Sequence, residues 1–307
     1  MRSGEAVDGR DSVTVYRDFD QAELERQYNA RATVPDVQPY LARYAAESAR
    51  MRAALPCHLD LAFGPTPEET LDIFPAAGPR AAPTMVFVHG GYWRLLGKAD
   101  SSFMAEAFTR AGVTVVALNY ALAPRVSLDE IVRQVRAAIA WLYREGKAYG
   151  VDPERIHAVG TSAGGHLAAM LLCPGWHDGL GVPEGVVKGA CVISGLFDLE
   201  PVRLSEPNEW LGLDAEAARR LSPIHHLPVS GCPLIVACAE TDTGEFKRQS
   251  RELAEAWAAR GFPCERIEMA GFNHFDVVLE LNRPTSPLTA AILRQMGLRP
   301  GGTPPPR

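Results

Sequence analysis

The 307-residue chain lacks any run approaching the ~18 apolar residues of a membrane-spanning helix. It has no basic stripe and carries a formal net charge of −6, which argues against a nucleic-acid partner. Residues 1–14 lack the apolar segment of a secretory signal peptide. The six cysteines include no C-x-x-C pair. These absences predict a cytoplasmic protein with reduced cysteines.

Patterns that bind metal ions are also missing. The chain contains no H-E-x-x-H sequence, and the adjacent pair His225-His226 lacks further ligands at a suitable spacing. No internal repeat is visible. We therefore expect a protein that needs neither a metal ion nor an organic cofactor.

The most informative stretch present is Gly160-Thr161-Ser162-Ala163-Gly164, between an apolar strand-like run and a helix-like run. A strand that turns at once into a helix crowds the residues around the turn, so glycine is required there. This G-x-S-x-G pattern is the nucleophile elbow of α/β-hydrolases, which exposes the serine hydroxyl above the sheet. It also directs the Ala163 N–H towards an oxyanion formed there. The motif occurs by chance in many chains, and only its strand-before, helix-after context favours catalysis.

Elsewhere, apolar strand-like runs alternate with helix-like segments, which predicts a mostly parallel sheet with helices on both faces. The fold class is thus α/β, of the α/β-hydrolase type. Two earlier runs, 59–63 and 70–74, alternate apolar and polar residues around a Gly-Pro turn and predict an antiparallel hairpin. The expected helices cover 18–31, 38–54, 100–111, 127–144, 245–260 and 286–296.

The domain organisation follows from composition. We expect a disordered lead over 1–14, a single α/β-hydrolase domain over 15–298, and a flexible tail over 299–307 with three consecutive prolines. Within the domain, residues 196–232 are loop-rich with one short helix near 214–221. We interpret this segment as a small cap insertion.

His89-Gly90-Gly91 follows the first central strand, 85–88. In α/β-hydrolases this loop supplies N–H groups to the oxyanion hole, and glycine lets the backbone approach the substrate oxygen. We therefore predict an oxyanion hole formed by Gly90, Gly91 and Ala163. The alternative, an ordinary glycine-rich turn, is disfavoured because both position and sequence match. His89 is expected to hold the loop and not to carry protons.

Catalytic residues in this fold follow the chain order serine, acid, histidine. Of the eight histidines, only His274 lies in a loop between the last expected strand, 265–269, and the last helix. His274 is therefore the predicted base. The acid should follow the strand 234–239, where Glu240 and Asp242 compete, and we favour Asp242 because it lies clearly in the loop. Asp198 is a weaker alternative, and Asp276 breaks the chain order.

Four segments together resemble the kynurenine formamidases (arylformamidases), α/β-hydrolases related to hormone-sensitive lipase. The likeness spans roughly residues 20–297. The H-G-G and G-x-S-x-G motifs are shared with many esterases, whereas the other segments are more specific. The resemblance implies Ser162 as nucleophile, Asp242 as acid and His274 as base. The segments are His89-Gly90-Gly91-Tyr92-Trp93, Gly160 to His166, Ser194 to Pro201, and Asp242 to Ser250.

The resemblance implies hydrolysis of the formamide of N-formyl arylamines such as N-formylkynurenine, a step of tryptophan catabolism that releases formate. Tyr92 and Trp93 are expected to stack on the aryl ring, although core packing is an equally open interpretation. A carboxylesterase for small acyl or aryl esters would share every triad feature. A binding protein on an inactive hydrolase scaffold is less favoured, because all three triad residues are present.

Overall fold

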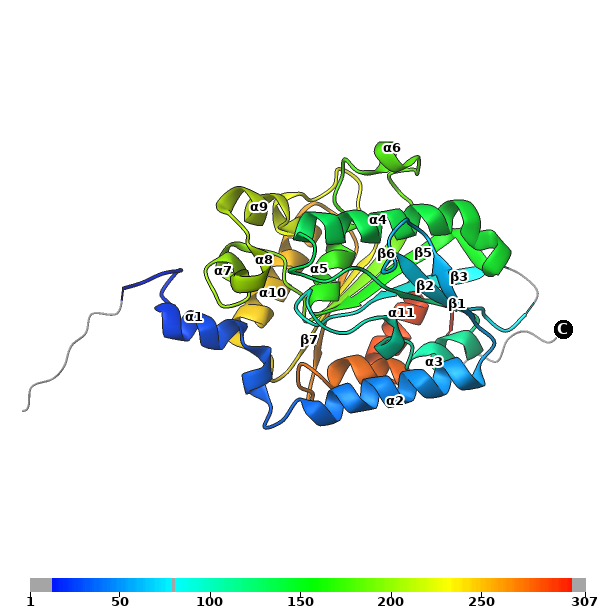
Figure 1. The fold of residues 1–307 in the computed structure, drawn as a ribbon, viewed down its shortest axis with the longest axis horizontal. Helices are drawn as coiled ribbons and strands as arrows, with labels where there is room; N and C mark the ends of the chain where they lie inside the picture. Colours follow the sequence, from blue (N-terminus) through cyan, green and yellow to red (C-terminus); the bar gives the residue numbers. More distant parts are fainter. Residues whose placement is uncertain (1–12, 79–80, 300–307) are drawn as a thin grey trace, which may run out of the picture.

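Eight strands form one sheet at the centre of the computed structural model, which describes residues 13–78 and 81–299 (Figure 1). The lead predicted over 1–14 and the tail predicted over 299–307 fall mostly outside these residues. The strands are β1 (His58–Ala62), β2 (Thr70–Phe74), β3 (Ala82–Val88), β4 (Thr114–Leu118), β5 (Val151–Thr161), β6 (Val187–Ile193), β7 (Leu234–Ala239) and β8 (Cys264–Met269).

The strand order across the sheet is β1-β2-β4-β3-β5-β6-β7-β8. β2 runs antiparallel to its neighbours β1 and β4, and the remaining neighbours pair in parallel. This is the mostly parallel sheet of the predicted fold class, and the antiparallel β1–β2 pair confirms the predicted hairpin.

Helices connect the strands in the predicted alternation. The α-helices are α1 (Gln21–Tyr28), α2 (Gln38–Ala54), α3 (Ala105–Arg110), α4 (Leu128–Glu145), α5 (Ala163–Met170), α6 (His177–Leu180), α7 (Glu200–Arg203), α8 (Asn208–Leu211), α9 (Ala215–Arg220), α10 (Gly244–Ala259) and α11 (Pro287–Gln295). The 3-10 helices are η1 (Ala30–Thr33), η2 (Lys98–Asp100), η3 (Gly146–Tyr149), η4 (Pro223–His225) and η5 (Val277–Asn282).

The segment 196–232, predicted to hold one short helix, contains α7, α8, α9 and η4. Two of the predicted helices also differ from the sequence-based expectation. The helix predicted over 18–31 is divided at Asn29, whose side chain accepts a hydrogen bond from the N–H of Ala32 and so starts η1. The helix predicted over 100–111 begins only at Ala105. Before it, the Ser102 N–H donates to the Ser48 hydroxyl of α2 at 3.1 Å, so this turn is held by a tertiary contact.

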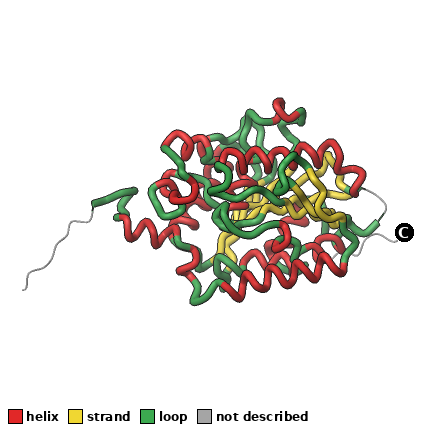
Figure 2. The backbone as a smooth tube through the Cα atoms, in the orientation of Figure 1, coloured by secondary structure: helices red, strands yellow, loops and turns green. Residues whose placement is uncertain are grey.

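Helices cover both faces of the sheet, as Figure 2 shows. α4, α5 and α10 contribute to the hydrophobic core on one face, and α2, α3 and α11 to that on the other. Successive residues of β3 alternate between them: Val86 and Val88 join the first core, Met85 and Phe87 the second. Burial on both faces explains why β3 is apolar along most of its length.

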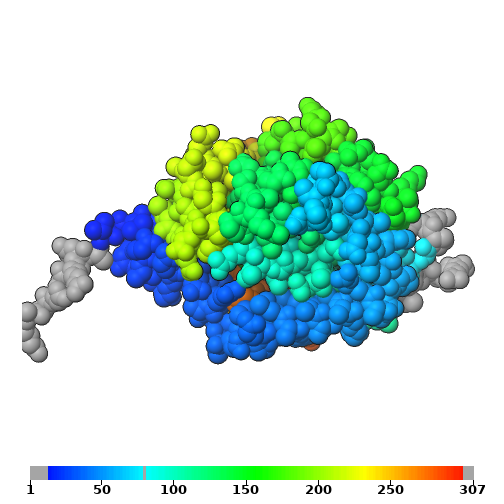
Figure 3. Space-filling model, in the orientation of Figure 1, coloured from blue at the N-terminus to red at the C-terminus, as the bar shows by residue number. Residues whose placement is uncertain are grey.

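The predicted catalytic segments gather at one edge of the sheet, because each follows the carboxyl end of a parallel strand. The H-G-G loop follows β3, Ser162 follows β5, Asp242 follows β7, and His274 follows β8. Open α/β sheets bind their ligands at this edge. Nearby, Gln21 of α1 donates to the Leu204 carbonyl at 2.9 Å. In Figure 3 the dark-blue N-terminal segment accordingly adjoins the yellow-green segment around residues 200–220.

Candidate active site

Ser162 occupies a strained turn between β5 and α5. Its φ of 54° lies in the left-handed region, which only glycine adopts easily. A Cβ at Gly164 would overlap the Val88 carbonyl oxygen, and one at Gly160 would overlap the Gly164 carbonyl oxygen. The Ser162 N–H donates to the Ile193 carbonyl of β6 at 2.8 Å, which holds the turn against the sheet. The local geometry is therefore that of a nucleophile elbow.

Asp242 and His274 are joined by a buried hydrogen bond. His274 Nδ1 lies 2.7 Å from Asp242 Oδ1. The other carboxylate oxygen accepts from the Ser194 hydroxyl at 2.5 Å and from the Ala239 N–H at 2.9 Å. Burial by itself raises the pKa of Asp242, but the charge of His274 and these hydrogen bonds outweigh burial and lower it. An ionised Asp242 can thus orient the His274 ring and stabilise its protonated form.

The other carboxylates considered from the sequence have different partners. Glu240 is exposed and accepts from the N–H of Gly271 at 2.5 Å. Asp276 accepts from Asn273 at 2.7 and 2.8 Å. Asp198 accepts from the hydroxyl of Tyr16 at 3.4 Å. Of the candidates in the described part of the chain, Asp242 is the one hydrogen-bonded to His274.

The H-G-G loop lies beside the elbow. Gly90 leaves no room for a side chain, since a Cβ there would lie 2.9 Å from the Thr161 carbonyl oxygen and 3.2 Å from the Ser162 Cβ. Gly91 has a φ of 102°. The backbone of this loop can therefore approach a substrate held at Ser162.

His89 anchors the same loop. Its ring stacks on Tyr120 with centroids 4.1 Å apart, and its Nδ1–H donates to the Gly90 carbonyl at 2.8 Å. The Tyr120 hydroxyl donates to the His89 carbonyl at 2.8 Å. Burial lowers the pKa of His89 to about 4, so the ring is neutral at physiological pH. A neutral, buried histidine fits the predicted loop-holding role.

Tyr92 and Trp93, the two predicted aryl contacts, occupy different environments. Tyr92 lines the cavity at Ser162, but Trp93 is 0% exposed and lies in the core. The Trp93 indole N–H donates to His166 Nδ1 at 3.3 Å, while His166 Nε2–H donates to the Leu221 carbonyl at 2.7 Å. This buried polar chain holds Trp93 against α5, so its ring packs in the core and does not reach the cavity.

The cavity at Ser162 and His274 has a volume of about 300 Å³. Its wall includes residues that the sequence did not single out, from four separate segments. Trp210 faces Tyr92 edge to face with centroids 6.1 Å apart, and its indole N–H donates to the Tyr92 carbonyl at 2.9 Å. No local motif marks these residues. The added lining residues are Tyr28, Asn29, Ala30, Arg31, Val37, Leu41, Tyr44, Arg94, Leu95, Leu96, Glu206, Pro207 and Trp210.

Over residues 13–78 and 81–299 no group of three or more histidines, cysteines or carboxylates is arranged to hold a metal ion. We expect full activity after exhaustive dialysis against a chelator, because a serine-histidine-aspartate set supplies nucleophile and proton transfer unaided. The measurement compares kcat/KM before and after dialysis. A loss of activity that added zinc restores would contradict the expectation.

Across the same two ranges, every helix is too short or too polar to span a bilayer.

The fold and this site define an α/β-hydrolase enzyme. The chain is 31% identical over 295 residues to the kynurenine formamidase of Salmo salar, which covers 92% of this chain and 98% of that protein. The kynurenine formamidase of Danio rerio is 30% identical, with 92% of this chain and 98% of the relative covered. The chain therefore belongs to the kynurenine formamidase family.

Other matches lie among esterases. A family model described as BD-FAE matches residues 71–180. Esterase LipQ of Mycobacterium tuberculosis is 32% identical over 166 residues, which is 51% of this chain and 37% of that protein. A solved structure from Silicibacter sp. tm1040, provisionally assigned as a thioesterase, is 30% identical with a TM-score of 0.76. The match covers 88% of this chain and 98% of the chain in that structure.

Proposed function

We propose that this enzyme is an arylformamidase that cleaves the formamide of N-formylkynurenine and related N-formyl arylamines, releasing formate. The observation that carries the proposal is the match to two kynurenine formamidases over 92% of this chain and 98% of each relative. The hydrogen-bonded Asp242–His274 pair and Ser162 in the strained elbow support it from the structural side.

In the proposed mechanism, Ser162 Oγ attacks the formyl carbon while His274 Nε2 takes the hydroxyl proton. The N–H groups of Gly90, Gly91 and Ala163 stabilise the resulting oxyanion. When the C–N bond breaks, protonated His274 gives its proton to the leaving arylamine nitrogen. Throughout, Asp242 keeps the imidazole in the required tautomer.

The second half of the reaction regenerates the serine. Water attacks the formyl ester on Ser162, and His274 accepts the water proton. The ester C–O bond then breaks, His274 returns the proton to Ser162 Oγ, and formate leaves. An arylamine leaves more readily than an alkylamine because its nitrogen lone pair is delocalised into the ring.

In this proposal Tyr92 and Trp210 contact the aryl ring, and Trp93 supports them from the core. The cap predicted over 196–232 contributes Glu206, Pro207 and Trp210 to the cavity wall, which supports its assignment as a cap. The site acts on a small molecule. A cytoplasmic location is part of the proposal, supported by the six free cysteines of the chain.

The direct test is turnover of N-formylkynurenine beside a short-chain p-nitrophenyl ester by the purified enzyme. The second candidate function is that of a carboxylesterase, which the partial match to esterase LipQ favours. A much higher kcat/KM for the ester, with negligible formamide hydrolysis, would support the esterase and refute the arylformamidase.

A preference for the formyl group over longer acyl groups is expected. Tyr92, Leu95 and Leu96 line the cavity beside Gly90 and Gly91, so bulk near the oxyanion loop restricts the acyl side. Each added methylene should raise the activation free energy by ~1–3 kcal/mol if the pocket cannot open. We expect kcat/KM to fall in the order formyl, acetyl, butyryl for matched anilides. A higher kcat/KM for the butyryl compound would identify a general esterase.

A further inference from the structure

The cavity wall contains charged side chains that the mechanism above does not use. Arg94 and Arg31 carry positive charge and Glu206 carries negative charge, and all three line the same cavity as Ser162 and His274. Among the described residues, the side chains of these three form no ion pair with one another or with any other residue. The cavity therefore presents both positive and negative charge to a ligand. No ion pair within the described part of the protein neutralises these charges.

Arg94 is half-buried and packs against an aromatic ring. Its guanidinium lies over the Trp210 ring, with Cζ 3.8 Å from the ring centroid. Such stacking stabilises a cation on an aromatic face and leaves the edge of the guanidinium free to donate. Because a guanidinium presents paired N–H groups in a planar fork, it suits two-point binding of a carboxylate. Arg31 is exposed and adds positive charge at the same cavity.

Negative charge lies on the cap side. The backbone N–H of Glu206 donates to the Glu25 carboxylate of α1 at 2.8 Å, which joins the cap to the N-terminal segment beside the cavity. Burial, reinforced by the negative charges of Glu206 and Glu25, raises the pKa of the Tyr92 hydroxyl. The Glu206 side chain is exposed and can accept hydrogen bonds from an ammonium group.

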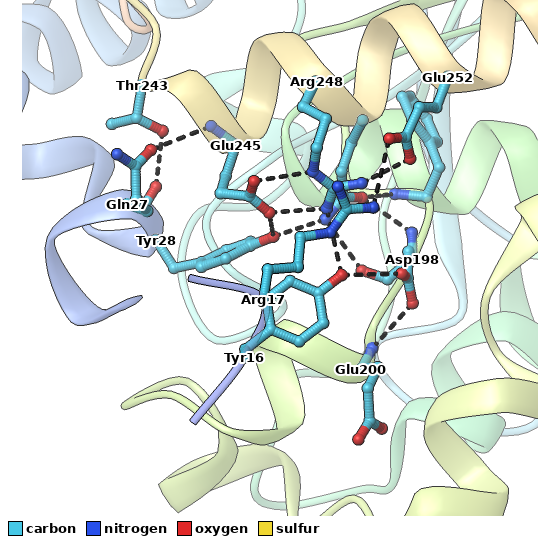
Figure 4. Close-up of polar contacts among 12 residues, drawn as sticks. Tyr16, Arg17, Gln27, Tyr28, Asp198, Glu200, Thr243, Glu245, Arg248 and Glu252 are labelled. Atoms are coloured by element: carbon cyan, nitrogen blue, oxygen red, sulfur yellow. Dashed lines mark hydrogen bonds and ion pairs between the residues drawn. The ribbon is translucent and has the colours of Figure 1, made fainter. Parts of the chain in front are cut away.

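The N-terminal part of the wall is held to the hydrolase core by a buried polar network (Figure 4). The Tyr28 hydroxyl donates to Glu245 of α10 at 2.8 Å and accepts from Gln249 at 2.8 Å. Arg248 pairs with Glu245 at 2.6 Å. The Tyr28 carbonyl in turn accepts from the Tyr92 hydroxyl. Tyr28 is thus held in place at the cavity by contacts to α10 and to Tyr92.

We infer that Arg94 and Glu206 form a subsite for the α-amino-acid group of the substrate, with Arg94 binding the carboxylate and Glu206 the ammonium. The inference rests on the proposed arylformamidase function and adds the two residues that would recognise the amino-acid group of its substrate. Trp210 links the two halves of the subsite. Its indole faces Tyr92 and supports Arg94, and its helix α8 follows Glu206 closely in the chain. Arg94 and Glu206 are specificity-determining residues that leave the chemical step to the triad.

The test compares kcat/KM for three formamides: N-formyl-L-kynurenine, its decarboxylated analogue N-formylkynurenamine, and its deaminated analogue 4-(2-formamidophenyl)-4-oxobutanoate. Wild type should prefer the complete amino acid over the decarboxylated analogue by roughly 10- to 100-fold, the range expected for a charge-assisted pair. Arg94→Gln should remove that preference, mainly through KM, and Arg94→Lys should keep part of it. Glu206→Gln should remove the preference over the deaminated analogue instead.

Arg266→Gln is the matched control, because Arg266 is exposed on β8 and does not line the cavity. The Arg266→Gln variant should leave kcat/KM for all three formamides unchanged. An equal loss on the three formamides in Arg94→Gln would overturn the inference, since a structural role would affect every substrate alike. Retained preference in both Gln variants would overturn it as well.

The outcome also separates this inference from the proposed function. If wild type hydrolyses formanilide and all three formamides without preference, the subsite fails and the arylformamidase stands. If wild type hydrolyses no formamide, the arylformamidase fails, and calorimetry with L-kynurenine decides the subsite independently. An at least tenfold weaker Kd in Arg94→Gln than in wild type supports it, and an unchanged Kd or no binding overturns it.

Discussion

Ser162→Ala is expected to abolish hydrolysis of every substrate while the protein remains folded. With the nucleophile removed, only binding and the oxyanion hole contribute, so kcat should fall by roughly 10⁵- to 10⁶-fold. The fold should persist because alanine keeps the Cβ and the backbone bond from residue 162 to Ile193 is unaffected. The left-handed φ of 54° is strained for both residues alike, so the free energy of unfolding should change little.

The measurement is single-turnover hydrolysis of N-formylkynurenine together with a thermal melt. A background from contaminating hydrolases is excluded by expressing the wild type and the mutant in parallel. Near wild-type turnover by a folded Ser162→Ala protein would contradict Ser162 as nucleophile. The same mutant also serves as a stable binding form, because it should retain the cavity and its charged wall.

His274→Ala should be about as severe as the serine change, and Asp242→Asn should lower kcat by roughly 10⁴-fold. The asparagine keeps the size of the carboxylate but cannot stabilise a protonated His274, and it allows the wrong imidazole tautomer. Because triad residues act as a unit, the double mutant His274→Ala/Asp242→Asn should be barely slower than His274→Ala alone. Additive losses in the double mutant would contradict a shared role.

Glu240→Gln is the matched control for Asp242→Asn, because it makes the same carboxylate-to-amide change two residues away. Glu240 is exposed and bonds the Gly271 N–H, so its loss should affect kcat by no more than a few-fold. Asp276→Asn tests the other alternative. If either of these variants inactivates the enzyme while Asp242→Asn remains active, the assignment of the acid is wrong.

The short catalytic motifs could be predicted from the sequence because the constraints that produce them act between residues close together in the chain. A serine in a strand-to-helix turn requires glycine at positions 160 and 164, where added side chains would overlap backbone atoms. The apolar strand runs and amphipathic helices follow from burial on one or both faces, which sets their periodicity. Chain order, together with a position between the last expected strand and the last helix, then singled out His274 among eight histidines.

Tertiary structure decided what depends on contacts between distant segments. Position in the chain left Glu240 and Asp242 in competition, with Asp198 as a weaker alternative, and a 2.7 Å hydrogen bond to His274 distinguishes Asp242 from the others. Two adjacent aromatics looked equivalent in sequence, yet the indole N–H of Trp93 finds its partner on α5 and the ring of Tyr92 lines the cavity.

The cavity wall shows the same division. Trp210 reaches Tyr92 across 118 residues, and Tyr28 reaches Glu245 across 217 residues. Neither contact produces a periodic pattern or a fixed spacing in the sequence, because each depends on how the cap and α1 pack against the rest of the fold. The sequence by itself therefore determined the fold class and predicted the catalytic residue types. Only the tertiary structure decided which side chains line the cavity, since the cavity wall is formed by segments that lie far apart in the sequence.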